Sequence, residues 1–205
     1  MPSPRPLPAT EQATVRGPSG ETMIRTFPIH TPRLCLRRFE VSDAPEAYDR
    51  WMSDSDVTEF LTWDPHGSPE ESERVILAWV QAYALGTLDW CISLRQDHAP
   101  VGSITAVQDF PGRGYCELGY CIAKDMWGKG YMTEAVRAVT GFIFQDARYD
   151  WVQARCDAEN HGSRRCLEKS GYTHAAEVWL PSPKGRREVR LYHVMRVCRG
   201  DMPRM

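Results

Sequence analysis

The sequence lacks the features that would assign it to a membrane or to a nucleic acid. No segment approaches the roughly 18 consecutive apolar residues of a membrane span. The formal net charge of -2 at pH 7 gives none of the positive excess that nucleic-acid binders carry. The start, Met1 to Pro8, has proline at every second position and no apolar signal core. We therefore predict a soluble, cytoplasmic protein that binds neither nucleic acid nor membrane.

Metal and redox motifs are also missing. The seven cysteines include no C-x-x-C pair, and the six histidines are scattered without ligand spacing. Several cysteines lie in apolar, strand-like runs, which indicates reduced thiols packed in a core. A nucleophilic cysteine, with Cys121 as the candidate, is the alternative. We predict no disulfide framework and no metal site.

Two standard phosphate-binding motifs are incomplete. The glycine spacing is too short for a P-loop, and one of the three glycines of a dinucleotide fingerprint is absent. The chain does contain a strand ending at Ile122 that leads through Gly128 and Gly130 into a helix beginning near Tyr131. A helix start leaves N–H groups without intrahelical partners, and glycines allow a ligand to approach the main chain. This junction predicts a site for a phosphorylated cofactor.

Length and composition favour one domain. A chain of 205 residues with 42% apolar content can bury one substantial core. We expect a flexible N-terminal tail over residues 1–28, one domain over 29–198 and a C-terminal tail over 199–205. The proline-rich start supports the first boundary.

The apolar periodicity predicts alternating strands and helices. Strands are expected at 34–39, 88–94, 101–107, 115–122, 151–156, 174–180 and 187–197, with helices at 42–52, from 69 to 85, 131–145 and 160–170. Ser68-Pro69-Glu70-Glu71 has the pattern of a capping box, Asn160 can cap a helix, and Gly171 can end it. Hairpins are antiparallel and a strand-helix-strand crossover is parallel, so we predict an α/β (α+β) fold with a sheet of mixed direction.

Three of these segments together resemble the GCN5-related N-acetyltransferase (GNAT) family. They are the strand end Tyr120-Cys121-Ile122, the helix opening from Trp127 to Ala135, and the segment from Asn160 to Tyr172. The resemblance covers about residues 31–197, and Thr31-Pro32-Arg33-Leu34 is similar to the branch that acetylates ribosomal-protein N-termini. It implies the GNAT fold: a mostly antiparallel sheet of six to seven strands, splayed at the cofactor site and flanked by about four helices.

The resemblance implies acetyl-coenzyme A (acetyl-CoA) as the acetyl donor, lying between the strands that end at Ile122 and Cys156. Asn160 is expected to contact the pantetheine arm, with capping alone as the alternative. Lys129 either adds favourable charge beside the pyrophosphate or is a solvated surface lysine. The expected cofactor-binding residues are Tyr120, Cys121, Ile122, Trp127, Gly128, Lys129, Gly130, Tyr131, Met132, Thr133 and Asn160.

The chain departs from the family pattern at two positions. Asp125 stands where Gln or Arg is usual, and we expect it to turn away from the pyrophosphate or to cap the helix. Leu167 replaces the tyrosine that protonates the departing thiolate in many members. A thiol with a pKa of roughly 8.5 leaves readily as an anion. Ser163, which the resemblance places near the thioester, is the candidate donor, directly or through water.

The acceptor amine is expected to attack the thioester directly. A lysine amine is about one part in a thousand neutral at pH 7, whereas an α-amine is roughly a tenth neutral and needs less from a base. Glu117 is the candidate base, acting through water, and an ion pair or a solvated face is the alternative. Backbone N–H groups near Tyr120 to Ile122 can polarise the thioester oxygen.

The acceptor site is expected between the first helices and the last hairpin. Phe60, Trp63 and Trp90 are candidate walls, with core packing as the alternative. The basic run from Lys184 to Arg190 could attract an acidic acceptor or form a solvated hairpin tip. We predict an N-acetyltransferase, monomeric or homodimeric, that acts on a protein N-terminal amine. The alternatives are a small-molecule amine acetyltransferase and a non-catalytic acetyl-CoA-binding protein.

Overall fold

The computed structural model describes residues 14–16, 22–108, 114–145, 149–182, 184 and 189–201. An eight-stranded sheet forms the domain, in the order β3-β4-β5-β6-β7-β8-β10-β9. Every neighbouring pair is antiparallel except β7 and β8, which are parallel. The predicted mixed, mostly antiparallel sheet is confirmed. It has one strand more than expected, because a two-residue edge strand, β3, precedes β4.

The elements follow each other along the chain in this order: β1 (Thr14–Arg16), β2 (Thr22–Ile24), β3 (Ile29–His30), β4 (Leu34–Arg37), η1 (Val41–Asp43), α1 (Ala44–Ala47), η2 (Tyr48–Met52), α2 (Ser55–Thr58), α3 (Pro69–Ala82), η3 (Tyr83–Leu85), β5 (Leu88–Leu94), β6 (Pro100–Gln108), β7 (Tyr115–Ile122), η4 (Lys124–Met126), α4 (Tyr131–Ile143), β8 (Trp151–Asp157), α5 (His161–Lys169), β9 (Thr173–Pro181), β10 (Val189–Cys198) and η5 (Arg199–Asp201). No helix in the described ranges is both long and apolar enough to cross a membrane.

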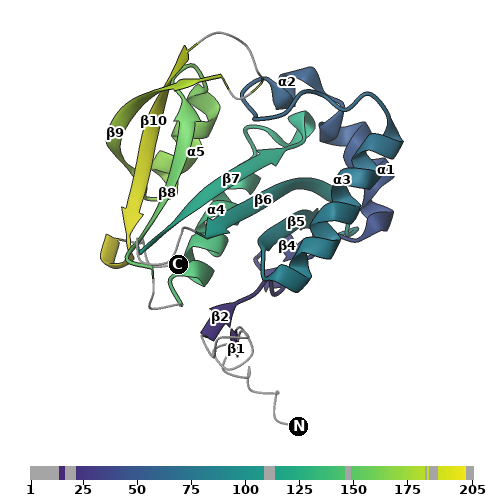
Figure 1. The fold of residues 1–205 in the computed structure, drawn as a ribbon, viewed down its shortest axis with the longest axis horizontal. Helices are drawn as coiled ribbons and strands as arrows, with labels where there is room; N and C mark the ends of the chain where they lie inside the picture. Colours follow the sequence, from purple (N-terminus) through teal and green to yellow (C-terminus); the bar gives the residue numbers. More distant parts are fainter. Residues whose placement is uncertain are drawn as a thin grey trace.

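Helices cover both faces of the sheet (Figure 1). On one face α4 buries a stripe of small and branched residues, including Ala135, Val136 and Val139, against the strands. On the other face the segment from η1 to α3 packs around the fully buried Trp51 and Ile76. The sheet is therefore a central layer between two apolar clusters.

Some residues outside the expected range of 29–198 are structured or contact the domain. β1 and β2 pair with each other inside the segment predicted as a tail. The Thr26 hydroxyl donates to the carbonyl of Thr87, and the carbonyl of Phe27 accepts from the indole of Trp90. At the other end, η5 follows β10 directly, and the Arg199 side chain donates to the carbonyl of Tyr149.

Two local predictions differ from the structure. The helix expected over 42–52 is a sequence of short 3₁₀, α and π segments. The expected capping box is absent: Ser68 is the N-cap residue but its side chain makes no capping bond, and the Glu71 carboxylate accepts from the N–H of Gly67 instead of that of Ser68. The turn predicted at 111–114 lies mostly outside the described residues.

The site is positioned by the one parallel pair in the sheet. β7 and β8 stay in register only from Tyr115 with Trp151 to Leu118 with Ala154. Beyond these residues the two strands diverge, as Figure 1 shows. The second half of β7 then has β6 on one side, and no strand among the described residues pairs with its other side.

Candidate active site

A cavity of about 790 Å³ opens where β7 and β8 diverge. Its walls come from the second half of β7, the turn into α4, the start of α5 and the segment that follows α2. This volume lies in the range of pockets that bind small molecules and cofactors. The polar groups that face it determine what it can hold.

The predicted glycine turn lines one part of the cavity. Gly128 and Gly130 have φ angles of 72° and 79°, in the left-handed region where a Cβ is strained. Gly130 is the N-cap residue of α4 and has no side chain that could cap this helix start. The first-turn N–H groups of a helix have no intrahelical acceptors, and the helix dipole adds partial positive charge. The turn is therefore suited to an anion such as a pyrophosphate.

Most of the predicted site residues line this cavity. The residues that were predicted and that line the cavity are Phe60, Tyr120, Cys121, Ile122, Trp127, Gly128, Gly130, Tyr131, Met132, Thr133, Asn160 and Ser163. Lys129 is not among the lining residues, and its carbonyl accepts a hydrogen bond from Arg33 at 2.9 Å. The structure therefore brings these predicted residues together around one cavity, and their role in binding a cofactor stays a prediction.

An ionic clamp behind the turn was not predicted. The Arg33 guanidinium donates to the Lys129 carbonyl, pairs with the Glu134 carboxylate at 2.6 Å and lies 4.3 Å from the centre of the Tyr131 ring. The Thr31 hydroxyl and the Arg33 N–H donate to the other carboxylate oxygen, at 2.6 and 2.9 Å. The segment Thr31 to Leu34, noted in the sequence only as a resemblance, thus ties β4 to the glycine turn.

The clamp alters the titration of Glu134. Partial burial alone would raise its pKa, but hydrogen bonds from Thr31 and Arg33, together with the guanidinium charge, lower it below the usual range. Ionised Glu134 is therefore favoured by the fold. Its contribution to stability is present above the ordinary carboxyl pKa and is lost as the pH falls through the lowered value.

Asp125 turns away from the turn, as expected from its charge. It does not line the cavity, and its carboxylate lies 3.1 Å from the guanidinium of Arg50. It does not cap α4, so the first of the two expected arrangements is the one observed. The backbone cradle is left without an adjacent acid side chain from η4.

Tyr120 lines the cavity, and its hydroxyl is close to α5. It is 2.9 Å from the hydroxyl oxygen of Ser163 on α5. Burial raises the pKa of this phenol well above its usual value, so it stays protonated at every physiological pH. The side chain of Tyr120 was missed in the sequence, which indicated only its backbone. A Tyr120–Ser163 pair can donate a proton where Leu167 cannot, since the leucine side chain has no acidic hydrogen. Leu167 is fully buried in the core.

Asn160 caps α5 as predicted. Its side-chain oxygen accepts from the N–H of Ser163 at 2.9 Å, and Gly171 takes the left-handed conformation, with φ 93°, just after the helix. The cap fixes Ser163 on the first turn of α5. Contact between Asn160 and a pantetheine arm stays a prediction.

Glu117 lies on β7 where that strand is still paired with β8. Its carboxylate is 2.7 Å from the Arg155 guanidinium and accepts from the Gln153 amide at 2.9 Å. It is absent from the cavity lining. The ion pair left open as the alternative is thus present, and a catalytic role for Glu117 stays a prediction.

Two of the three aromatic wall residues expected for the acceptor site are elsewhere. Trp90 is fully buried in the core, where its indole donates to the carbonyl of Phe27 and its ring meets Phe142 edge-on. Trp63 packs against the apolar cluster that contains Trp51 and Ile76, and its ring centre lies 5.1 Å from that of His66. Only Phe60 lines the cavity.

Cys121 behaves as a packing residue. It is 8% exposed, its sulfur lies 3.3 Å from the Ser103 hydroxyl, and burial raises the pKa of the thiol. A protonated, buried thiol is a poor nucleophile. This agrees with the packing interpretation.

The last hairpin reaches the wall formed by α2. Lys184 donates to the carbonyl of Thr58 at 2.7 Å and lies 3.6 Å from the Asp64 carboxylate. Arg190 pairs with Asp157 at 2.8 Å and lies over the ring of Phe60. These two basic residues are neither a solvated tip nor a free anion site; they fasten the hairpin to the cavity wall. The rest of the predicted basic run lies largely outside the described residues.

The same fold occurs in solved acetyltransferase structures. A GNAT-family acetyltransferase from Bacillus anthracis aligns with a TM-score of 0.73 at 22% identity, over 85% of this chain and 99% of that one. A ribosomal-protein-S5-alanine acetyltransferase from Vibrio fischeri aligns with a TM-score of 0.68 at 18% identity, over 87% and 100%. These alignments show that the chain has the same fold as those two structures.

Sequence comparisons show the family to which the chain belongs. A family model described as "Acetyltransferase (GNAT) domain" matches residues 33–173. Bacillus subtilis YnaD, an uncharacterized N-acetyltransferase, is 28% identical over 158 residues, covering 77% of this chain and 89% of YnaD. Bacillus licheniformis p20, also an uncharacterized N-acetyltransferase, is 24% identical over 145 residues, covering 70% and 81%. The chain belongs to the GNAT family of acetyltransferases.

Proposed function

We propose that this enzyme transfers an acetyl group from acetyl-CoA to the α-amine of a protein or peptide N-terminus. The observation that carries the proposal is the juxtaposition, in one cavity, of the left-handed glycine turn at α4 and the Tyr120–Ser163 hydroxyl pair. The turn suits a pyrophosphate, and the hydroxyl pair suits a departing thiolate.

The residues of the cavity fit acetyl-CoA. In the proposal, the amides from Gly128 to Met132 hold the pyrophosphate, and Arg165 and Lys169 add positive charge along α5. When bound, acetyl-CoA supplies an acetyl thioester. The edge of β7 from Gly119 to Ile122, which β8 leaves uncovered, offers backbone groups that could orient this thioester and polarise its oxygen.

The proton donor we propose is the hydroxyl pair. Tyr120 keeps its proton because burial raises its pKa, and Ser163 can pass a proton between Tyr120 and the cavity. Two hydroxyl groups 2.9 Å apart form a short relay of the kind used in general acid catalysis.

The proposed acceptor needs little help to lose its proton. An α-amine with a pKa of about 7.7–8.0 is roughly a tenth neutral at pH 7, so a dedicated base is optional. Glu59, which lines the cavity directly after α2, favours the approach of a cationic amine, whereas the Asp56 carboxylate beside it is paired with Lys124. The Vibrio fischeri structural neighbour is titled an acetyltransferase of a ribosomal-protein alanine, which supports a peptide acceptor.

The acceptor class is tested by competition between matched peptides. Purified enzyme with acetyl-CoA is given one lysine-containing peptide in two forms, with a free and with a blocked N-terminus, and thiol release and the acetylated position are measured. We expect acetylation at the free α-amine and none of the blocked peptide. Turnover on the blocked peptide, or only on small amines such as polyamines, would refute this acceptor.

A further inference from the structure

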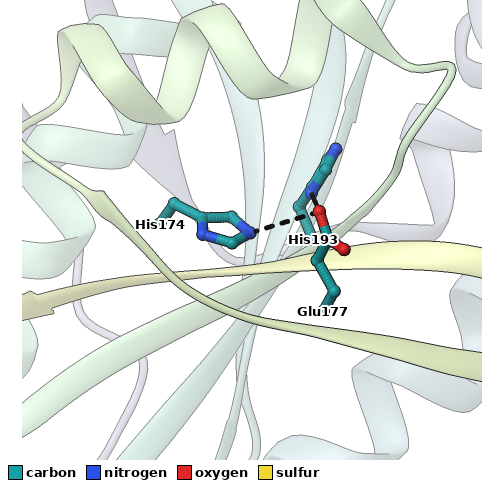
Figure 2. Close-up of side chains that lie close together, drawn as sticks. All are labelled: His174, Glu177 and His193. Carbon is teal, nitrogen blue, oxygen red and sulfur yellow. Dashed lines mark ion pairs between the residues drawn. The ribbon is translucent and has the colours of Figure 1, made fainter.

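Three potential metal ligands meet on the last two strands, outside the cavity. His174 and Glu177 belong to β9, and His193 belongs to β10. One ligand atom from each lies within 4.8 Å of the others. Both imidazoles face a single carboxylate oxygen of Glu177, at 3.9 Å from His174 Nε2 and 3.5 Å from His193 Nδ1 (Figure 2). None of the three residues lines the acetyltransferase cavity.

A β-bulge brings His174 and Glu177 to the same face. Residues three apart in a regular strand point to opposite faces. Here Glu177 pairs with His193 and Ala176 with Val194, but Met195 pairs with His174, so Ala175 is the extra residue of the bulge. His174 therefore shares the face of Glu177 and His193. This is why the spacing in the sequence predicted no metal site.

The buried member of the cluster lacks a hydrogen-bond partner. His193 is 8% exposed, and within the described part of the chain its Nδ1 atom is buried without a hydrogen bond. A buried polar atom of this kind costs free energy unless a water or an ion satisfies it. The neighbouring side chains of His174 and Glu177 are 43% and 53% exposed, so an ion can reach the cluster from solvent.

The donor set selects the class of ion. Two imidazole nitrogens and one carboxylate suit zinc and its first-row neighbours, whereas magnesium and calcium prefer oxygen ligands alone. Ligand atoms about 2.0–2.2 Å from zinc in a tetrahedron lie roughly 3.4 Å apart. The distances from the Glu177 oxygen to His193 Nδ1 and to His174 Nε2, 3.5 and 3.9 Å, are close to this value. Rotation of the exposed His174 ring would shorten the third distance, which joins the two imidazole nitrogens.

We propose that His174, Glu177 and His193 bind one divalent transition-metal ion of the zinc class, with water at the open position. The ion fastens β9, the edge strand of the sheet, to β10 at the bulge where the register shifts. Metal binding then adds to folding stability, because the three ligands converge only in the folded sheet.

The proposal is tested by titrating zinc chloride into the untagged, chelator-treated full chain in a calorimeter. We expect saturable binding of one ion, and dissociation constants at least about tenfold weaker for His174→Ala and for Glu177→Gln. Both substituted side chains are largely exposed, so folding should persist, which circular dichroism verifies. His30→Ala, an exposed histidine on β3, is the matched control and should bind like the wild type.

Cobalt substitution identifies the ligands. Cobalt bound by imidazole and carboxylate shows visible d–d bands without thiolate charge transfer, and His174→Ala should weaken these bands. A thiolate charge-transfer band would assign the ion to the cysteines, of which Cys198 is exposed. That result, unchanged zinc affinity in both variants, or no saturable binding by the wild type would overturn the proposal.

Discussion

The two halves of strand β7 have the same neighbour on one side and different surroundings on the other. From Tyr115 to Leu118 the strand is paired with β8, and Glu117 finds partners on that strand in Gln153 and Arg155. From Gly119 to Ile122 β8 has moved away, and Tyr120 faces the cavity and Ser163. A β7 side chain with a partner on β8 is held in place by the fold. A β7 side chain beyond the last residue pair with β8 is available to a ligand.

The largest effect on turnover is expected at the uncovered half. Tyr120→Phe removes the hydroxyl and keeps the buried ring, so acetyl-CoA affinity should persist while turnover falls. General acids contribute about 10²–10⁴-fold, and we expect the lower end because a thiolate leaves readily. Steady-state kinetics of thiol release measures this.

The pH profile gives an independent check on Tyr120. Since burial raises the pKa of this phenol, no loss of activity from its deprotonation is expected up to pH 10. Ser163→Ala, which removes only the relay partner, should have the smaller effect. Wild-type turnover in Tyr120→Phe would refute the proposed donor.

The second largest effect is expected on acetyl-CoA affinity, from loss of the Arg33–Glu134 clamp behind the glycine turn. Arg33→Met keeps much of the side-chain length but loses the bond to the Lys129 carbonyl and the pair with Glu134. We expect about tenfold weaker acetyl-CoA binding, because a hydrogen bond from a charged group contributes about 1.5–3 kcal/mol and part of it positions the turn. Calorimetric titration measures this, with Arg38→Met as the control, because Arg38 follows β4 and donates to the backbone carbonyl of Thr26, away from the clamp. Equal affinities in the two variants would exclude a role for the clamp.

Acidification should loosen the same clamp. The pKa of Glu134 is lowered in the fold, so its stabilisation is full above the ordinary carboxyl pKa of about 4.3 and is lost as the pH falls through the lowered value. Because Glu134 keeps its charge in the folded enzyme down to that lowered value, we expect acetyl-CoA affinity to fall a few-fold further in the wild type than in Glu134→Gln only below the ordinary carboxyl pKa. Parallel pH dependence in both proteins would show that Glu134 does not control the turn.

The smallest effect is expected at the covered half. Glu117 is engaged by Arg155 and Gln153, and an α-amine needs little from a base, so Glu117→Gln should lower turnover by less than about threefold. The peptide assay described above measures this. A loss of a hundredfold or more would establish Glu117 as the base and would remove the contrast between the two halves of the strand.

Local patterns in the sequence were sufficient for the cofactor side of the site. The strand end at Ile122, the glycines before α4 and the Asn160 cap each depend on residues a few positions apart, and each is present in the structure. A helix start and a tight turn are determined by nearby residues. The elements that build the anion cradle could therefore be predicted.

Contacts between distant segments could not be predicted in the same way. The clamp joins Arg33 to Glu134, about a hundred positions apart. Which face Trp90 occupies and which partner Glu117 meets depend on strand register, which no local pattern records. The bulge at Ala175 shows the same limit, because one extra residue reverses the face of every side chain beyond it. Contacts that join one strand to another could therefore be assigned only from the structure.

The central claim is that the glycine turn holds the pyrophosphate of acetyl-CoA, and a cycle of two ligands and two proteins tests it. Gly128→Val forces a β-branched residue into left-handed backbone, although a Cβ there meets no atom within 4 Å. Gly114→Val, with φ 71° just before β7, places the same residue in left-handed backbone outside the cavity and is the control. The measurement is calorimetric affinity for acetyl-CoA and for S-acetylpantetheine, which lacks the pyrophosphate and the nucleotide. We predict that Gly128→Val weakens acetyl-CoA binding by about a hundredfold, equivalent to about 2.7 kcal/mol, and leaves S-acetylpantetheine binding unchanged. Equal losses for both ligands, or no loss for acetyl-CoA, would contradict the account.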